Sequence, residues 1–327
     1  MKKILAVAIA AALTAPVAFA DVTFSGFVEQ EFSSRDTAAG YDQGLEGDSD
    51  VGVVVNASED LGNGMTAFAK IDLGMDDRNA DTAASASVQS NDQIVGLSGG
   101  FGTVVVGAME DFTEGKVMAM ASIFESDSQN LEGGDGQNAG RFDNGMAYVS
   151  PNFSGFQVGI AGYALDTGTG LTAAQTNDNF DAVDMMASYS NGPITVRLAR
   201  ETTDTDTVGA TQGKTNTSLG AQYNSGAFSV VAVMQKSDNV NNTAANDYTD
   251  WMLGGSYTFG NNKVVAGYEH DEQTVSGTST DENNWQVEFQ HMFSKRTKVY
   301  VGHHSADAAP TATKDGDATY FGMKHTF

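Results

Sequence analysis

The last ten residues, ATYFGMKHTF (318–327), alternate two kinds of side chain up to the final position. One side of this run carries Thr319, Phe321, Met323, His325 and Phe327. Alternation with a period of two predicts a β-strand, because successive side chains of a strand point to opposite faces. Chain ends are commonly frayed unless the fold holds them. We therefore expect a C-terminal strand whose apolar face remains in an apolar environment to its last residue.

The same alternation recurs along the chain in segments of about ten residues. In one of them Trp285, Val287 and Phe289 alternate with Gln286 and Glu288. The expected strands lie near residues 22–32, 51–59, 65–75, 90–98, 102–109, 143–150, 155–165, 181–190, 193–202, 214–224, 227–236, 248–259, 263–271, 282–293, 297–305 and 317–327.

The connections between these segments are alternately short and long. The short ones are 59–64, 99–102, 151–155, 191–193, 224–226, 260–262 and 294–296. The long ones are 33–50, 76–89, 110–142, 166–180, 203–213, 237–247, 272–281 and 305–316. Tight turns at one end and long loops at the other indicate a transmembrane β-barrel, here of sixteen antiparallel strands.

Two other β architectures also produce alternation, and both fit less well. Strands of a soluble β-sandwich are commonly nearer five or six residues, and nothing here repeats at a fixed solenoid spacing. In lipid every backbone N–H and C=O must be paired within the protein, which a closed barrel achieves. Pairing the last strand with the first, near 22–32, would close it.

The first twenty residues, MKKILAVAIAAALTAPVAFA, predict a secretory signal peptide. Lys2 and Lys3 precede an apolar core, and Ala18-Phe19-Ala20 forms a small-x-small cleavage site. The alternative is a transmembrane helix, for which the apolar stretch is too short. The expected division is a signal peptide over 1–20 and a barrel domain over 21–327.

Composition excludes several classes of function. The net charge of −25 excludes nucleic acid as a partner, and the absence of cysteine excludes a disulfide-stapled domain. The five histidines have neither metal-ligand spacing nor a triad arrangement, so we expect no enzyme activity and no metal site. These histidines are His270, His291, His303, His304 and His325.

Five segments, in order, resemble the general porins of Gram-negative outer membranes, with the Rhodobacter-type porins most similar. The segments are DVTFSGFVEQ (21–30), SEDLGNGMTAFAKIDL (58–73), GGFGTVVVGAMEDF (99–112), GRFDNGMAYVSPNFSGFQVGIAGYAL (140–165) and YFGMKHTF (320–327). The resemblance implies a water-filled barrel, a homotrimer in contact with outer-membrane lipid and lipopolysaccharide, and a longest loop that folds inward. It also implies that Phe327 belongs to a signal for the barrel-assembly machinery.

The same resemblance implies an acidic inward loop that faces a basic wall across the pore, which would select solutes by size and charge. The expected acidic residues are Glu110, Asp111, Glu114, Glu125, Asp127, Glu132 and Asp135. The expected basic residues are Arg141, Lys70, Arg35 and Arg197. Arg141 matches a family wall arginine through GRFDN (140–144), although a solvated charge at the loop end is the alternative.

The basic half of this expected constriction is depleted. Asp50 and Ala108 stand where the family often places arginines. We therefore predict passive diffusion of ions and small hydrophilic solutes with a preference for cations. The alternatives are a substrate-selective porin, and a structural or adhesive barrel that binds partners or calcium through its acidic loops. No cofactor is expected, although EGDSD (46–50) and TTDTDTVG (202–209) have oxygen-rich spacing that could hold Ca²⁺.

Overall fold

The computed structural model describes residues 21–36, 42–75, 88–126, 140–164, 180–203, 213–240, 246–306 and 317–327. The predicted signal peptide 1–20 lies outside these ranges. Within them, no helix has both the length and the apolar character needed to cross a membrane.

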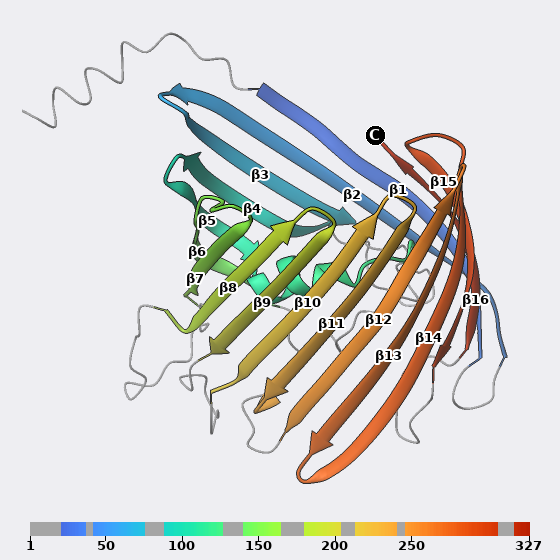
Figure 1. The fold of residues 1–327 in the computed structure, drawn as a ribbon. Coiled ribbons are helices and arrows are strands. Elements are labelled where there is room, and N and C mark those ends of the chain that lie inside the picture. Colours follow the sequence, from blue (N-terminus) through green and yellow to red (C-terminus); the bar gives the residue numbers. More distant parts are fainter. Residues whose placement is uncertain are drawn as a thin grey trace, which may run out of the picture.

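The described residues form sixteen antiparallel strands that close into one barrel (Figure 1). Each strand pairs with its neighbours in sequence, and β1 pairs with β16. The strands are β1 (Asp21–Asp36), β2 (Asp42–Gly62), β3 (Met65–Met75), β4 (Val88–Gly99), β5 (Gly102–Glu110), β6 (Arg141–Val149), β7 (Phe156–Tyr163), β8 (Ala182–Asn191), β9 (Ile194–Thr203), β10 (Thr215–Ser225), β11 (Phe228–Asp238), β12 (Asp247–Phe259), β13 (Asn262–Val275), β14 (Thr278–Met292), β15 (Thr297–Ala306) and β16 (Ala318–Thr326). The predicted fold class is confirmed.

The C-terminal residue takes part in the closure of the barrel. The N–H of Gly26 donates to the C=O of Phe327 at 3.2 Å, and the N–H of Phe327 donates to the C=O of Gly26 at 3.0 Å. A closed barrel leaves no unpaired sheet edge. The final phenylalanine therefore extends the pairing of β16 with β1 to the end of the chain.

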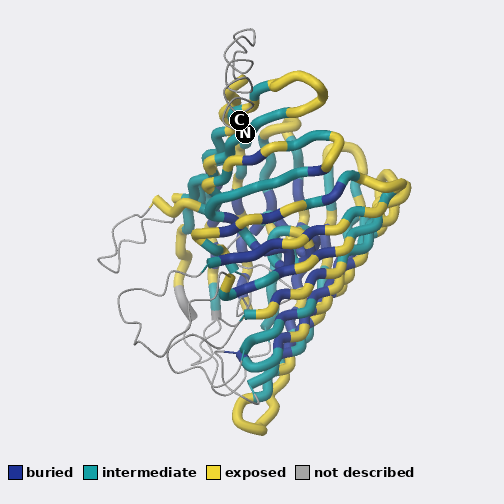
Figure 2. Tube along the Cα trace, turned by 90° about the vertical axis from the view of Figure 1, so that its left-hand side faces the viewer, coloured by how far each residue is buried: buried dark blue, intermediate teal, exposed yellow. Residues whose placement is uncertain are grey.

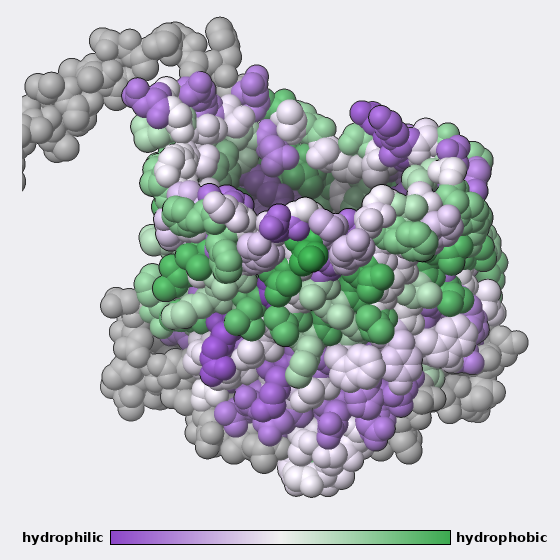
Figure 3. Space-filling view, in the orientation of Figure 1, coloured by the Kyte–Doolittle hydropathy of each residue, from purple (hydrophilic) through white to green (hydrophobic). Residues whose placement is uncertain are grey.

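The two faces of the wall carry different side chains. On β14, Trp285, Val287 and Phe289 are each about 40% exposed, whereas the intervening Gln286 and Glu288 are buried toward the lumen. Buried and exposed residues alternate in this way along many strands (Figure 2). The exposed apolar side chains form a band between two polar rims, and the view opens into the mouth of the barrel (Figure 3). This band is the surface expected to face hydrocarbon.

Two predicted loops are largely strand. β13 ends only at Val275 and β14 begins at Thr278. The prediction of a long loop at 272–281 is therefore wrong. Ser276 and Gly277 have positive φ angles of 51° and 82°, which suits a tight two-residue hairpin turn. This end of the hairpin extends beyond the apolar band, so both faces of its strands meet water and carry mostly polar residues. The alternation of apolar and polar residues is therefore lost around Ser276 and Gly277. The loop predicted at 33–50 is likewise wrong over most of its length, since β1 extends to Asp36 and β2 begins at Asp42.

The connection after β5 folds into the barrel. It forms the short helical turns η1 (Thr113–Val117) and η2 (Met118–Met120). η1 contacts β9 and β10, and η2 contacts β10 and β11. These turns lie behind the front strands in Figure 1. This inward segment, residues 111–126, is called the constriction loop below.

Candidate functional site

A single aspartate organises the start of the constriction loop. The carboxylate of Asp111 accepts hydrogen bonds from the N–H of Glu114 at 2.6 Å and from the N–H of Gly140 at 3.0 Å. The N–H of Asp111 donates in turn to the C=O of Gly140 at 2.9 Å. Both ends of the connection between β5 and β6 are therefore joined through Asp111. Its side chain is 1% exposed, so it supports the backbone and does not present a free charge to the lumen.

Two wall carboxylates lie beside Asp111. Asp184 on β8 accepts the N–H of Phe112 at 2.5 Å, and Glu201 on β9 is also buried. Burial raises the pKa of the Asp111 carboxyl well above its usual range, and the hydrogen bond and charge of Glu201 raise it further. Lys214 lies close to the same group, and burial lowers its pKa. The first residues of the constriction loop therefore pack against a buried cluster of carboxyl groups, those of Asp111, Asp184 and Glu201.

Apolar packing holds the middle of the constriction loop against the wall. Phe112 and Val117 pack in one cluster with Met186 and Ala199, whereas Met120 and Phe124 belong to another. The wall residues of the second cluster are Val231, Val233, Met252 and Val265.

Wall glycines make room for this packing. A Cβ at Gly159 would lie 2.8 Å from the ring of Phe112, and a Cβ at Gly220 would lie 2.7 Å from the sulfur of Met120. Such distances are shorter than ordinary contacts. The glycines therefore let the constriction loop lie directly on the wall.

A third wall carboxylate holds the far end of the constriction loop. Glu288 on β14 accepts the N–H of Glu125 at 3.1 Å and the N–H of Ser126 at 3.2 Å. Lys263 on β13 donates from Nζ to the C=O of Ile123 at 3.2 Å. The loop is therefore attached near β8 at its start and near β13 and β14 at its end, so it crosses the lumen.

Three lumenal lysines surround this far end, and our sequence analysis did not include them. Lys298 on β15 forms an ion pair with Glu125, and Lys324 on β16 lies 2.8 Å from Glu29 and 3.7 Å from Glu125. Lys263 is the third. The alternation of the last two strands could have identified Lys298 and Lys324, because both share the face of buried Tyr300 and Tyr320.

The expected basic residues do not form one cluster. Lys70 pairs with Asp92 at 2.7 Å and with Asp72 at 3.0 Å. Arg197 donates to the C=O of Lys116 in the constriction loop at 2.7 Å. The remaining two lie elsewhere: Arg141 pairs with Glu110 at 2.5 Å, and Arg35 donates to Oγ of Ser33 at 3.2 Å near the long-loop end of β1.

The expected acidic residues also separate into groups. Glu110 and Glu125 pair with cations, Asp111 is buried, and Glu114 is half-buried at the start of the loop. Asp127, Glu132 and Asp135 lie outside the described residues. Four further carboxylates, which were not among the expected pore residues, lie on β1 and β2, where Asp48 is in register with Glu31 and Asp50 with Glu29.

The two candidate calcium segments receive no structural support. EGDSD (46–50) belongs to strand β2, not to a loop, and most of TTDTDTVG (202–209) lies outside the described residues. Across the described part of the chain, no group of three His, Asp or Glu side chains is placed to hold a metal ion.

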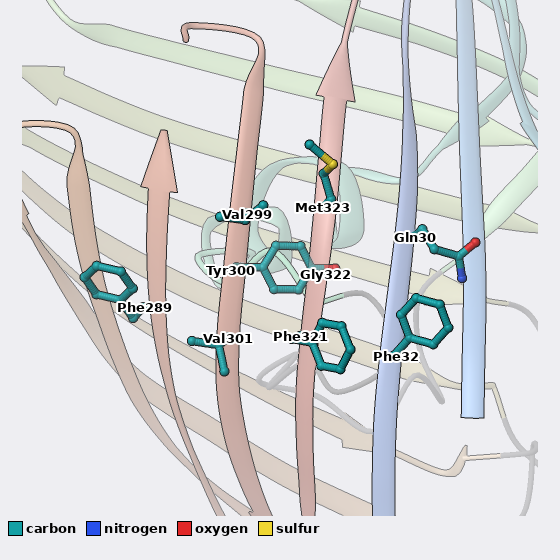
Figure 4. Close-up of a pocket in the computed structure, with 9 residues that line it drawn as sticks. All are labelled: Gln30, Phe32, Phe289, Val299, Tyr300, Val301, Phe321, Gly322 and Met323. Carbon is teal, nitrogen blue, oxygen red and sulfur yellow. The ribbon is translucent and has the colours of Figure 1, made fainter. Parts of the chain in front are cut away.

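An apolar groove of about 550 Å³ lies on the outer face of the barrel near the closure strands (Figure 4). Its apolar lining includes Phe32, Phe289, Val299, Val301, Phe321 and Met323. These side chains lie on the exposed face of their strands, and the polar Gln30 is tied to the C=O of Asp48 at 2.7 Å. The groove therefore belongs to the apolar exterior and not to the lumen.

A family model described as Gram-negative porin matches residues 6–309 of the chain. Outer membrane porin protein 32 of Delftia acidovorans is 28% identical over 235 residues, which are 67% of this chain and 65% of that protein. The chain thus aligns with slightly less than two thirds of this relative's length.

Solved structures share the fold. An anion-selective porin from Comamonas acidovorans has a TM-score of 0.75 at 22% identity, covering 94% of this chain and 100% of that chain. The trimer form of OmpT, an outer membrane protein of Vibrio cholerae, has a TM-score of 0.69 at 16% identity, covering 94% and 99%. At these identities the likeness concerns the fold alone.

Proposed function

Because the chain belongs to the family of Gram-negative porins, we propose that it forms a water-filled channel for passive diffusion of ions and small hydrophilic solutes. It is an outer-membrane protein, as the family and the closed sixteen-stranded barrel establish. No covalent step is involved, and porins are channel proteins and not enzymes.

The observation that carries this proposal is the constriction loop. It crosses the lumen between Asp184 and Glu288, and charged side chains of the wall surround it. A narrow neck lined by fixed charges selects solutes by size and by charge. The neck is built from the wall and from a loop fixed to it at both ends, so we expect a permanently open pore.

We further propose that cations are preferred. Asp48 lies in register with Glu31, and Asp50 with Glu29, on the lumenal faces of β1 and β2. Glu29 pairs with Lys324, and the negative potential of the other three carboxylates would concentrate cations. The lysines at the far end of the constriction loop oppose this negative potential, but Lys298 and Lys324 are each paired with a carboxylate. The Comamonas acidovorans porin of the same fold is called anion-selective, so the sign of selectivity must be measured in this chain.

A homotrimer is also proposed. The solved OmpT of Vibrio cholerae exists in a trimer form, and the present barrel shares its fold. Native mass spectrometry of the folded protein in detergent would give the mass directly. A single-chain mass under conditions that preserve the barrel would reject the trimer.

Single-channel recording tests the function. The folded protein is inserted into a planar bilayer under a potassium chloride gradient. Ohmic steps with a reversal potential that favours potassium are expected. Steps that favour chloride would keep the channel and reject the cation preference, whereas a folded barrel without conductance would favour a structural or adhesive role.

A further inference from the structure

A recess in the lumen wall lies beneath the first turn of the constriction loop. It has a volume of about 420 Å³, within the range of sites that hold small organic ligands. Phe112, Gly115 and Lys116 of the loop cover it. The opposite side is formed by residues of β4 to β9, so the recess lies between the constriction loop and this part of the wall.

The floor of the recess is apolar. Ile94, Val105, Met109, Val149 and Met186 project into it from neighbouring strands. Most lumenal positions of the described strands β10 to β16 are polar or charged, apart from those that carry the constriction loop. Apolar surface in contact with water favours an apolar occupant, because removing such surface from water is favourable. The floor therefore suits the hydrocarbon body of a ligand.

Four charged side chains line the recess besides Asp111, and they are not equivalent. The carboxylates of Asp92 and Glu110 are already paired, with Lys70 at 2.7 Å and with Arg141 at 2.5 Å. The cations are Lys116 and Arg197. Among the described residues neither has a carboxylate within ion-pair distance, and Arg197 donates only to the C=O of Lys116, at 2.7 Å.

The buried Asp111 does not supply the missing counter-charge. Its oxygens accept the N–H groups of Glu114 and Gly140. The charges that remain available at the recess are therefore positive, although the chain as a whole is strongly acidic. An anionic group placed beside Lys116 and Arg197 would form charge-assisted hydrogen bonds, which are stronger than neutral ones.

From this juxtaposition we infer that the recess binds small amphiphilic monoanions, with an apolar body on the Met109 and Met186 floor and a carboxylate on Lys116 and Arg197. The inference rests on the proposed channel function, because solutes reach the recess from the lumen. It gives the channel a side site for one solute class. Such a site would retain these solutes at the constriction while other solutes pass.

Calorimetric titration of the folded protein in detergent with sodium benzoate tests the inference. Three probes each change one property: benzyl alcohol lacks the charge, acetate lacks the apolar body, and phenylalanine adds an ammonium group. Benzoate is expected to bind about tenfold more tightly than benzyl alcohol, the factor that one charge-assisted contact supplies, and also more tightly than acetate and phenylalanine. Equal binding of benzyl alcohol or phenylalanine would overturn the assignment to monoanions.

The Lys116→Gln variant is expected to weaken benzoate binding about tenfold. Lys236→Gln is the matched control, because Lys236 lies on the exposed face of β11, where it pairs with Asp238 at 2.7 Å. Unchanged binding in Lys116→Gln, or an equal loss in Lys236→Gln, would overturn the site.

Conductance of the same preparations separates the two proposals. A protein that conducts but does not bind benzoate would reject this site alone. A folded protein that does not conduct would reject the channel function, whatever the calorimetry shows.

Discussion

The main-chain N–H of Phe112 donates to Oδ2 of Asp184 at 2.5 Å, so a wall carboxylate on β8 holds the second residue of the constriction loop. Asp184 is fully buried, and a buried donor that loses its acceptor costs about 1–3 kcal/mol. We expect Asp184→Ala to loosen the loop start while the barrel persists, because no strand pairing depends on this bond.

Single-channel noise provides the measurement for Asp184. The alanine variant should show larger current fluctuations than the unmodified protein, and Asp184→Asn, which keeps a carbonyl oxygen, should show an intermediate effect. If alanine and asparagine both leave the current trace unchanged, the bond to Phe112 does not hold the loop.

The far end of the constriction loop gives a second prediction. Glu288→Ala removes the acceptor of two N–H groups, those of Glu125 and Ser126. We expect frequent transient changes in conductance, because the far end of the constriction loop would no longer be fixed to β14. Glu288→Gln retains one acceptor oxygen and should restore most of the steady current. Equal behaviour of the two variants would indicate that the charge of Glu288, and not its bonds to the loop, determines the effect.

Acidification should stabilise the start of the loop. Burial and the neighbouring Glu201 raise the pKa of Asp111, so the folded protein binds a proton there more readily than the unfolded chain does. For a raised carboxyl pKa, the favourable contribution is present at low pH and is lost as pH rises through the interval between the usual and the raised pKa. The usual value is about 4, so the loss begins above that pH. Asp184, Glu201 and Lys214 face the same carboxyl group from the neighbouring wall.

Urea unfolding followed by gel mobility of the folded barrel would measure this pH dependence. The free energy of unfolding should fall as pH increases from about 4, and Asp111→Asn should flatten part of that fall. An unchanged slope in the asparagine variant would assign the pH dependence to other carboxylates.

The barrel could be predicted from the sequence because the apolar band imposes a period of two on every membrane-crossing strand. Trp285 and Phe289 face outward as the alternation indicates, and Phe327 closes the barrel against Gly26. Beyond the apolar band, water contacts both faces of a strand, and the alternation of apolar and polar residues disappears. The extension of β13 and β14 to a turn at Ser276 and Gly277 was missed for that reason.

The inward loop could be located from its length, but not the directions of its side chains. Asp111 and Glu125 are both acidic residues of that loop, yet one is buried against its own backbone and the other pairs with Lys298 and Lys324. Their difference arises from contacts with strands that are more than seventy residues away in sequence. Lys298 and Lys324 were not predicted as pore residues, because their contacts with Glu125 depend on where the constriction loop meets the wall, which the sequence does not show.

Removal of Phe327 should weaken closure of the barrel. The deletion abolishes the two main-chain hydrogen bonds between this residue and Gly26 and removes an exposed aromatic side chain at the end of β16. We expect a lower yield of folded protein in vitro and a lower melting temperature. Phe327→Ala keeps the main-chain bonds and should fold better than the deletion. The role of Phe327 in recognition by the assembly machinery stays a separate prediction, which requires comparison of insertion in cells.

Lys298, at the far end of the constriction loop, gives the sharpest test of ion selectivity. Lys298→Gln removes one positive charge from the lumen and leaves Glu125 with one lysine within ion-pair distance, Lys324 at 3.7 Å. A unit charge about 8 Å from a passing ion changes its energy by about 0.5 kcal/mol in water, with opposite sign for potassium and chloride. The two effects together change the permeability ratio of potassium to chloride by about fivefold. The reversal potential under a potassium chloride gradient should therefore move toward potassium in Lys298→Gln and toward chloride in Glu125→Gln. Lys236→Gln changes the total charge equally but lies on the outer face, and it should leave the reversal potential unchanged. A shift of the same size in Lys236→Gln would mean that overall charge, and not the constriction, sets the selectivity.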